Sequence, residues 1–218
     1  MENSEIEFKS KHWDNFYSSD QLNELRPPSQ FGAFIIGEIS KDTIVIDIGC
    51  GNGRDSLFFS GQNIAVVGID ASVHAINDCV NFAKLLNSKA LFLNSNINNE
   101  SLVEKIKTVE EYKQSKSVLV YARFFLHAIT ETDENALFSF VSSIGENRTT
   151  RFAIEFRTHR DATMPKTTAH HFRRFINPAN LMVKAIQLGF KVEYFIEGFG
   201  LAKYKEDDAH VARFIFIK

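Results

Sequence analysis

The sequence is poor in the residues that define several protein classes. Its 218 residues include only two cysteines, Cys50 and Cys79, too few for a disulfide scaffold or a four-thiolate zinc site. We expect free thiols in a reducing compartment. The N-terminus shows no basic start followed by an apolar stretch, and no apolar run reaches about 18 residues. We therefore predict a cytoplasmic protein without a signal peptide, a membrane span or a membrane partner.

The chain also has little net charge. Its 25 Lys and Arg oppose 27 Asp and Glu, a formal balance of −2, which excludes a globally basic protein that coats nucleic acid. Hydrophobic residues make up 44% of the sequence, enough for one buried core. We expect a helical cap over residues 1–40, broken at Pro27–Pro28, followed by one domain over residues 41–218.

Short β-branched runs alternate with amphipathic segments along the chain. We predict strands at residues 43–48, 64–69, 90–93, 117–121, 151–157, 190–196 and 210–217. We predict helices at residues 54–60, 73–86, 101–107, 131–143 and 178–188, the fourth of them opened by a capping pattern at Thr130–Asp133. The last two strands are joined by a non-helical stretch, which favours an antiparallel hairpin. The pattern indicates an α/β fold, with a seven-stranded, mostly parallel sheet, helices on both faces and an antiparallel last strand.

A glycine-rich loop, D-I-G-C-G-N-G at Asp47–Gly53, follows the first predicted strand. Glycines let the chain turn sharply and let a ligand approach main-chain amides, with a helix N-terminus behind them. The dinucleotide fingerprint would need glycine where Arg54 stands, and the Gly-Lys-Ser/Thr of a phosphate loop is missing. Asp70 ends the second strand, where it could accept both ribose hydroxyls of a nucleoside. The alternative interpretation is a tight turn without a ligand.

Val45–Gly53 and Gly68–Asp70, with the strand order, resemble the class I S-adenosylmethionine-dependent methyltransferases over roughly residues 40–218. The resemblance implies a Rossmann-like fold and S-adenosylmethionine (SAM) as cofactor. It implies that the loop backbone lines the methionine part, that Asp47 helps to hold the amino group and that Asp70 binds the ribose. Asn96, with Ile97 beside it, matches the place where the family contacts adenine. The predicted cofactor-binding set is Asp47, Gly49, Cys50, Gly51, Arg54, Asp70, Ala71, Asn96, Ile97 and Tyr121.

The methyl acceptor is expected beyond the carboxyl ends of the strands. Arg123 and His127 follow the fourth strand and Arg157 ends the fifth, so we predict these three as catalytic residues. His127 could act as a general base, but we favour a positioning role; a packed histidine is the third possibility. The predicted acceptor-binding set is Trp13, Tyr17, Arg26, His159, Arg160, His170, Arg173 and Tyr204.

Several acceptor chemistries find no matching motif. The (Asn/Asp/Ser)-Pro-Pro-(Tyr/Phe) turn that amino-methylating enzymes of nucleobases share is missing after the fourth strand. No cysteine nucleophile lies near this edge, and no acidic cluster offers metal ligands. Methylation of nucleic acid is thus disfavoured, and no metal site is predicted, the His170–His171 pair included.

The charge is unevenly distributed. Residues 148–174 contain seven Lys and Arg against two acidic residues, a balance of +5, so the rest of the chain carries −7. This stretch includes the long loop after the fifth strand, and a cationic loop beside the site suggests an anionic acceptor. The alternative is a solvated surface loop.

Two short motifs, Arg123–Ile129 and Phe199–Tyr204, resemble small bacterial methyltransferases found among surface-polysaccharide enzymes, some associated with O-methyl phosphoramidate decoration of capsules. We therefore predict O-methylation of a small anionic metabolite that bears a phosphate or phosphoramidate. Methylation of RNA or protein, and a non-catalytic SAM-binding role, are the alternatives.

Overall fold

The computed structural model describes residues 27–164, 172–204 and 206–218. Its strands are β1 (Thr43–Ile48), β2 (Ala65–Asp70), β3 (Leu91–Asn94), β4 (Ser117–Arg123), β5 (Thr149–Arg157), β6 (Lys191–Gly198) and β7 (Val211–Ile217). Its helices are α2 (Gln30–Ile35), α3 (Arg54–Gly61), α4 (Val73–Leu85), α5 (Leu102–Lys107), α6 (Glu110–Gln114), α7 (Glu131–Ile144) and α8 (Pro178–Gln187). Two short 3-10 turns, η2 (Leu126–Ala128) and η3 (His159–Asp161), follow β4 and β5.

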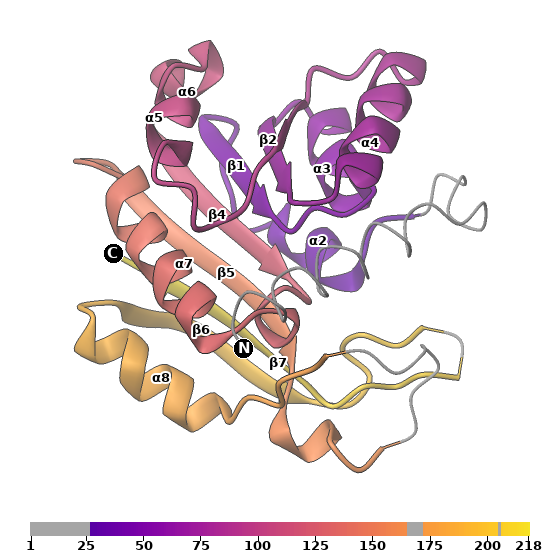
Figure 1. Ribbon diagram of the computed structural model, residues 1–218, viewed down its shortest axis with the longest axis vertical. Helices are drawn as coiled ribbons and strands as arrows, with labels where there is room; N and C mark the ends of the chain where they lie inside the picture. The colour runs from indigo at the N-terminus through magenta and orange to yellow at the C-terminus, as the bar shows by residue number, and fades with distance from the viewer. Residues whose placement is uncertain (1–26, 165–171, 205) are drawn as a thin grey trace.

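The strands form one sheet in the order β3-β2-β1-β4-β5-β7-β6 (Figure 1). Strands β1 to β5 pair in parallel, whereas β7 is antiparallel to both β5 and β6. The predicted mostly parallel sheet with an antiparallel last strand is confirmed. Because parallel strands end at the same edge, the glycine loop and the ends of β2, β4 and β5 lie along one side of the sheet.

Alternate side chains of each strand enter two different cores. The larger core lies under α5, α6, α7 and α8, and it contains Ile44, Ile46 and Ile48 of β1. The smaller core lies under α2 and α3 on the opposite face. Phe31 and Ile35 of α2 are fully buried there, so this part of the predicted cap packs directly on the sheet.

Side-chain caps fix where several helices begin. Thr130 and Asp133 form a reciprocal capping box at the start of α7, as the sequence predicts. Asn177 caps α8 just before Pro178. Ser29 caps α2, which begins at Gln30, two residues after Pro28. Within the described residues, no helix is long and apolar enough to cross a membrane.

Two strand boundaries differ from the prediction in a way that matters for the site. β4 continues two residues past Tyr121 to Arg123, and β5 begins two residues before Arg151. Both extensions are stabilised by ladder pairing between β4 and β5. Arg123 is consequently held on a strand instead of in a loop.

Candidate functional site

The glycine loop has the backbone that its sequence demands. Gly49, Gly51 and Gly53 all have positive φ, at 71°, 55° and 77°. The amides of Gly49 and Cys50 both donate to the carbonyl of Ile69 at the end of β2. A Cβ on Gly49 would lie 2.4 Å from the Phe125 ring, so this position excludes any larger residue. The loop therefore presents bare backbone at the carboxyl edge.

Asp70 ends β2 beside this loop. One carboxylate oxygen accepts a hydrogen bond from the Gly51 amide at 2.9 Å, and the other accepts one from the Ser72 amide at 2.9 Å. Exposed Ala71 follows it, and the Asn94 side chain donates to the carbonyls of both residues. This fixed carboxylate fits the predicted ribose contact.

The other predicted nucleoside contacts lie just after β3. Asn96 is exposed, and its side-chain oxygen accepts from the Asn98 amide. Ile97 beside it is buried. Their contact with adenine stays a prediction.

Asp47 lies beneath the loop on the face covered by α3. It is buried, and one of its oxygens accepts a 2.6 Å hydrogen bond from the Ser56 hydroxyl. Burial raises the pKa of Asp47 to about 7, although the Ser56 hydrogen bond opposes this shift. A cationic amino group nearby would favour the ionised form.

Tyr121, a predicted cofactor residue, points into the smaller core instead of the open edge. It is 1% exposed, and its hydroxyl donates to Asp55 at 2.8 Å. Asp55 also accepts from the amide and hydroxyl of Ser29. Burial would raise the pKa of Asp55, but Arg54, Arg123 and Ser29 lower it below its usual value. Sequence reasoning missed Asp55, whose signal was a carboxylate in the first turn after the glycine loop.

The two cysteines meet under the loop without a disulfide. Cys79 lies on α4, and its thiol donates to the Gly51 carbonyl at 3.1 Å. Burial, followed by contact with Cys79, raises the pKa of the Cys50 thiol well above its usual value. The Cys50 thiol is thus a protonated packing group at neutral pH.

Arg123 projects from the end of β4 on the same face as Asp47. Its side chain is 20% exposed, and its Nε lies 2.8 Å from Glu155 of β5. Phe124 follows with φ of 56°, a strained value for a bulky residue. The Phe124 ring lies beneath the Arg123 guanidinium at 4.3 Å and contacts the His127 ring edge-on.

His127 is buried in η2. The Arg157 amide lies 3.5 Å from its Nδ1, at the limit of a hydrogen bond. When Nδ1 accepts that bond, the neutral ring carries its proton on Nε2. Nε2 is then a donor, which agrees with a positioning role better than with proton abstraction.

The guanidinium of Arg157 is engaged within the protein. It is 6% exposed and pairs with Asp161 at 2.8 Å and with Asp207 in the β6–β7 connection. Asp161 accepts from the His210 amide as well. Arg157 thus joins two loops, and a contact with acceptor stays a prediction.

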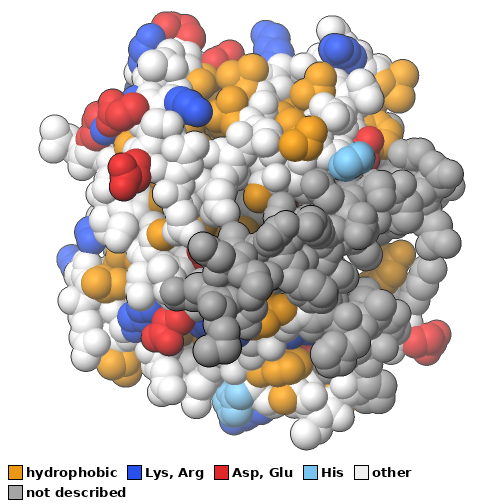
Figure 2. Space-filling model, in the orientation of Figure 1, with side chains coloured by type: hydrophobic (Ala, Val, Ile, Leu, Met, Phe, Trp, Pro, Cys, Tyr) orange, Lys and Arg blue, Asp and Glu red, His pale blue; other side chains and the backbone are white. Residues whose placement is uncertain are grey.

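The basic stretch does not form one patch over the site. Arg148 and Arg151 lie at the opposite, amino end of β5, where Arg148 donates to the Tyr112 and Ser115 carbonyls and Arg151 pairs with Glu193. The predicted cationic loop beside the site is therefore wrong for these two residues. Strand β5 runs across the sheet between them and the later residues of the stretch. On the face in Figure 2, side chains of both charge signs are interspersed outside the grey atoms.

Of the remaining residues predicted to bind the acceptor, one group lies within the described part of the chain and a second group lies outside it. Exposed Arg160 pairs with Glu197, and burial and Arg157 lower the pKa of Arg173. His159 is exposed on η3, and Tyr204 is half exposed. The second group lies outside the described residues: Trp13, Tyr17, Arg26 and His170.

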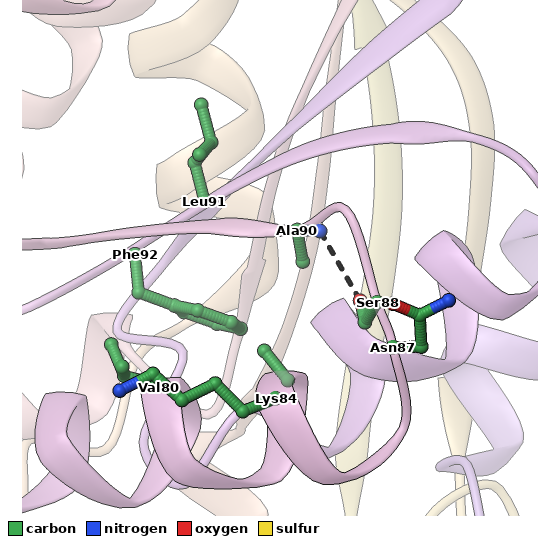
Figure 3. Close-up of a pocket in the computed structure, with 8 residues that line it drawn as sticks. Val80, Lys84, Asn87, Ser88, Ala90, Leu91 and Phe92 are labelled. Carbon is green, nitrogen blue, oxygen red and sulfur yellow. Dashed lines mark hydrogen bonds between the residues drawn. The ribbon is translucent and has the colours of Figure 1, made fainter.

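A hollow of about 530 Å³ lies elsewhere, between α4 and the edge strand β3 (Figure 3). Lys84, Asn87 and Ser88 line it at the end of α4, away from the carboxyl edge of the sheet. It is therefore separate from the glycine-loop site. Within the described ranges, no group of three or more His, Cys, Asp or Glu side chains could hold a metal ion.

Comparison with known proteins identifies the fold. Residues 39–138 match a family model described as a methyltransferase domain, and no curated protein sequence gives a significant match. A SAM-dependent methyltransferase from Methanosarcina mazei is similar at a TM-score of 0.65 and 17% identity, over 85% of this chain and 96% of that chain. One from Anabaena variabilis is similar at a TM-score of 0.67 and 15% identity, over 96% and 92%.

Magnesium protoporphyrin IX methyltransferase from Synechocystis, solved with bound SAM, is similar at a TM-score of 0.58 and 13% identity, over 97% of this chain and 82% of that chain. Residues 39–138 therefore resemble a methyltransferase domain, and the chain as a whole has the fold of these SAM-dependent methyltransferases.

Proposed function

We propose that the protein transfers a methyl group from SAM to an oxygen of a small anionic metabolite that carries a phosphate or phosphoramidate, in surface-polysaccharide biosynthesis. The observation that carries the cofactor assignment is Asp70, held by the Gly51 and Ser72 amides beside a loop of three positive-φ glycines. We also propose a cytoplasmic location, which the free Cys50 and Cys79 support.

The residues present fit this cofactor. Asp70 would hold the ribose hydroxyls, and the Gly49–Gly51 backbone would lie along the methionine part. Asp47 lies directly before the loop, where its carboxylate would attract the ammonium group of the methionine part. The ammonium would in turn favour the ionised form of Asp47. When bound, SAM supplies an electrophilic methyl group on a sulfonium.

The acceptor would lie beside Arg123. This guanidinium is partly exposed at the end of β4, above the Phe124 ring. Arginine binds phosphate and carboxylate oxygens through paired N–H donors. An acceptor oxygen that is already ionised needs no general base, so alignment and water exclusion would be the main contributions of the protein. His127, as an Nε2 donor, would position the acceptor.

Calorimetry with SAM and with its demethylated product tests the cofactor assignment. We expect the wild type to bind both, and Asp70→Asn to weaken binding by roughly 10- to 100-fold, because a charge-assisted hydrogen bond contributes about 1.5–3 kcal/mol. Asp42→Asn, an exposed aspartate paired with Lys116 far from the loop, is the matched control. The assignment fails if neither compound binds, or if Asp70→Asn equals the control.

Methyl-transfer assays with phosphorylated sugars, cytidylylated phosphoramidates, neutral sugars and bulk RNA test the acceptor class. We expect the anionic sugars or phosphoramidates to react best. Preference for neutral acceptors would overturn the proposal. Methylation of RNA that falls steeply with added salt would replace it with the RNA alternative. Binding of SAM without turnover on any acceptor would favour a non-catalytic role.

A further inference from the structure

Three charged side chains lie in one row across the sheet at its carboxyl edge. In the strand register, Arg123 of β4 is directly opposite Glu155 of β5, and Glu155 is directly opposite Arg213 of β7. All three therefore point to the same face. Glu155 is fully buried and lies between the two arginines, 2.8 Å from Arg123 Nε and 2.6 Å from Arg213 Nε.

The two arginines are held to different degrees. Arg213 is 6% exposed, donates to Glu155 and to the Leu201 carbonyl, and lies 5.1 Å from the Phe31 ring centroid. Arg123 contacts Glu155 without hydrogen-bond alignment at its Nε. Among the described residues, its two terminal nitrogens donate no side-chain or backbone hydrogen bond, and its ion pair with Glu155 is through Nε. The available donors of the row are thus at the Arg123 end.

The row also contains more positive than negative charge. Two guanidinium groups share one carboxylate. Asp55, whose pKa Arg123 also helps to lower, pairs with Arg54, so the row itself keeps one positive charge at the edge of a core. Burying charges is costly, and apolar side chains of similar size often stabilise a fold as well or better. A row of this composition is readily explained if a ligand anion supplies the missing negative charge.

We propose that Arg213, acting through Glu155, positions Arg123 as the oxyanion-binding group of the site. The ligand group is a carboxylate or phosphate, either the α-carboxylate of the cofactor or the anionic group of the acceptor. The inference rests on the proposed function for these two sources. Arg213 and Glu155 are positioning residues, because Arg123 alone would touch the anion.

Calorimetry with two cofactor forms tests the first source. SAM and decarboxylated SAM differ only in the α-carboxylate. If Arg123 binds that group, Arg123→Met weakens SAM tenfold or more and leaves decarboxylated SAM within twofold. Arg213→Met then weakens SAM several-fold, and Arg213→Lys restores part of the loss. In the Arg123→Met background, Arg213→Met has no further effect, because its influence passes through Arg123.

Inorganic phosphate, titrated into protein saturated with the demethylated cofactor, tests the second source. If Arg123 binds the acceptor anion, both arginine variants lose phosphate binding while SAM affinity stays unchanged. Arg151→Met is the matched control, since Arg151 is on the same strand as Glu155 but pairs with exposed Glu193 at the other end of the sheet. Circular dichroism melts confirm that each variant is folded, and Glu155→Gln replaces any variant that is not.

The proposal is overturned if both arginine variants leave the SAM preference and phosphate binding at control values. It is also overturned if Arg213→Met weakens binding equally with and without Arg123. Failure of the wild type to bind SAM or its demethylated product would instead refute the proposed function. Phosphate titrated into the cofactor-free wild type, Arg123→Met and Arg151→Met would then still decide whether the row binds an anion.

Discussion

Two arginine clusters lie on the same face of the sheet, yet they differ in the hydrogen-bond donors that they leave available for a ligand. Arg123 shares one carboxylate with Arg213, whereas Arg157 is itself shared between Asp161 and Asp207. The first cluster has more cations than anions and exposed donors. In the second cluster, the Arg157 guanidinium pairs with two carboxylates of the protein and thereby connects the loops that carry them. An arginine at a strand end therefore indicates an anion site only when its cluster contains fewer carboxylates than arginines.

The largest expected effect is on stability at the second cluster. Arg157→Met removes the guanidinium that pairs with fully buried Asp161 and with Asp207. We expect a loss of about 3–5 kcal/mol in the free energy of unfolding, measured by urea denaturation. Arg123→Met is the comparison, and we expect a clearly smaller loss because Glu155 keeps Arg213. Equal losses would show that the two arginines do not differ as described.

Asp47 provides a pH test beside the first cluster. Its folded pKa of about 7 lies above its ordinary value of 3.8, so the native state holds a proton that the unfolded chain releases. Its contribution to the stability of the cofactor-free protein is therefore full below about pH 4 and is lost as the pH rises toward 7. The slope reaches at most about 1.4 kcal/mol per pH unit. Asp47→Asn should flatten this slope between pH 5 and 7 in urea titrations.

The same group should make cofactor binding pH-dependent in the opposite direction. The ammonium group of SAM favours ionised Asp47, so affinity should rise with pH up to about 7, by at most tenfold per unit, and then level off. Asp47→Asn should remove the dependence in calorimetry between pH 5.5 and 8. A wild-type profile as flat as that of the variant would contradict the role of Asp47.

Phe124 separates the two clusters, with Arg123 on its ring at 4.3 Å and Arg157 at 5.8 Å. Its φ of 56° suits glycine better than any residue with a side chain. Because Ala and Gly both remove the ring, comparing Phe124→Gly with Phe124→Ala isolates the backbone strain. We expect the glycine variant to be more stable by about 1 kcal/mol in thermal unfolding. An alanine variant of equal stability would argue against the strained conformation.

The smallest effect should come from Arg160, whose side chain is 63% exposed and pairs with Glu197. Arg160→Gln should change the free energy of unfolding by less than about 1 kcal/mol, and less still at high salt. A loss of stability as large as that of Arg157→Met would contradict the expectation that the exposed ion pair of Arg160 contributes less than the buried pairs of Arg157.

The parts of the fold that depend on local sequence could be predicted. Hydrophobic runs such as Thr43–Ile48, the glycine loop and the capping pattern at Thr130 all act within a few residues. The partners of Arg157 could not, because Asp207 is 50 residues away and is brought near only by the β6–β7 connection. The same reason explains why the basic stretch gave a wrong expectation for Arg148 and Arg151.

The row itself carried a sequence signal that was not used. Glu155 and Arg213 each stand alone among apolar residues, in Phe-Ala-Ile-Glu-Phe and Val-Ala-Arg-Phe-Ile. An isolated charge inside a buried strand requires a partner on a neighbouring strand. Two such charges of opposite sign in neighbouring strands predict each other, but the strand order and register are needed to see that they meet.

The register of β4, β5 and β7 has an evolutionary consequence. Positions 123 and 155 are opposite each other across one strand pair, and positions 155 and 213, which are 58 residues apart in the chain, across the next. Losing the central acid would leave two buried cations in contact, whereas losing one arginine would remove the surplus charge. Relatives of this chain should therefore inherit the three positions as a set, and a lineage that no longer binds the anionic group should have replaced all three together.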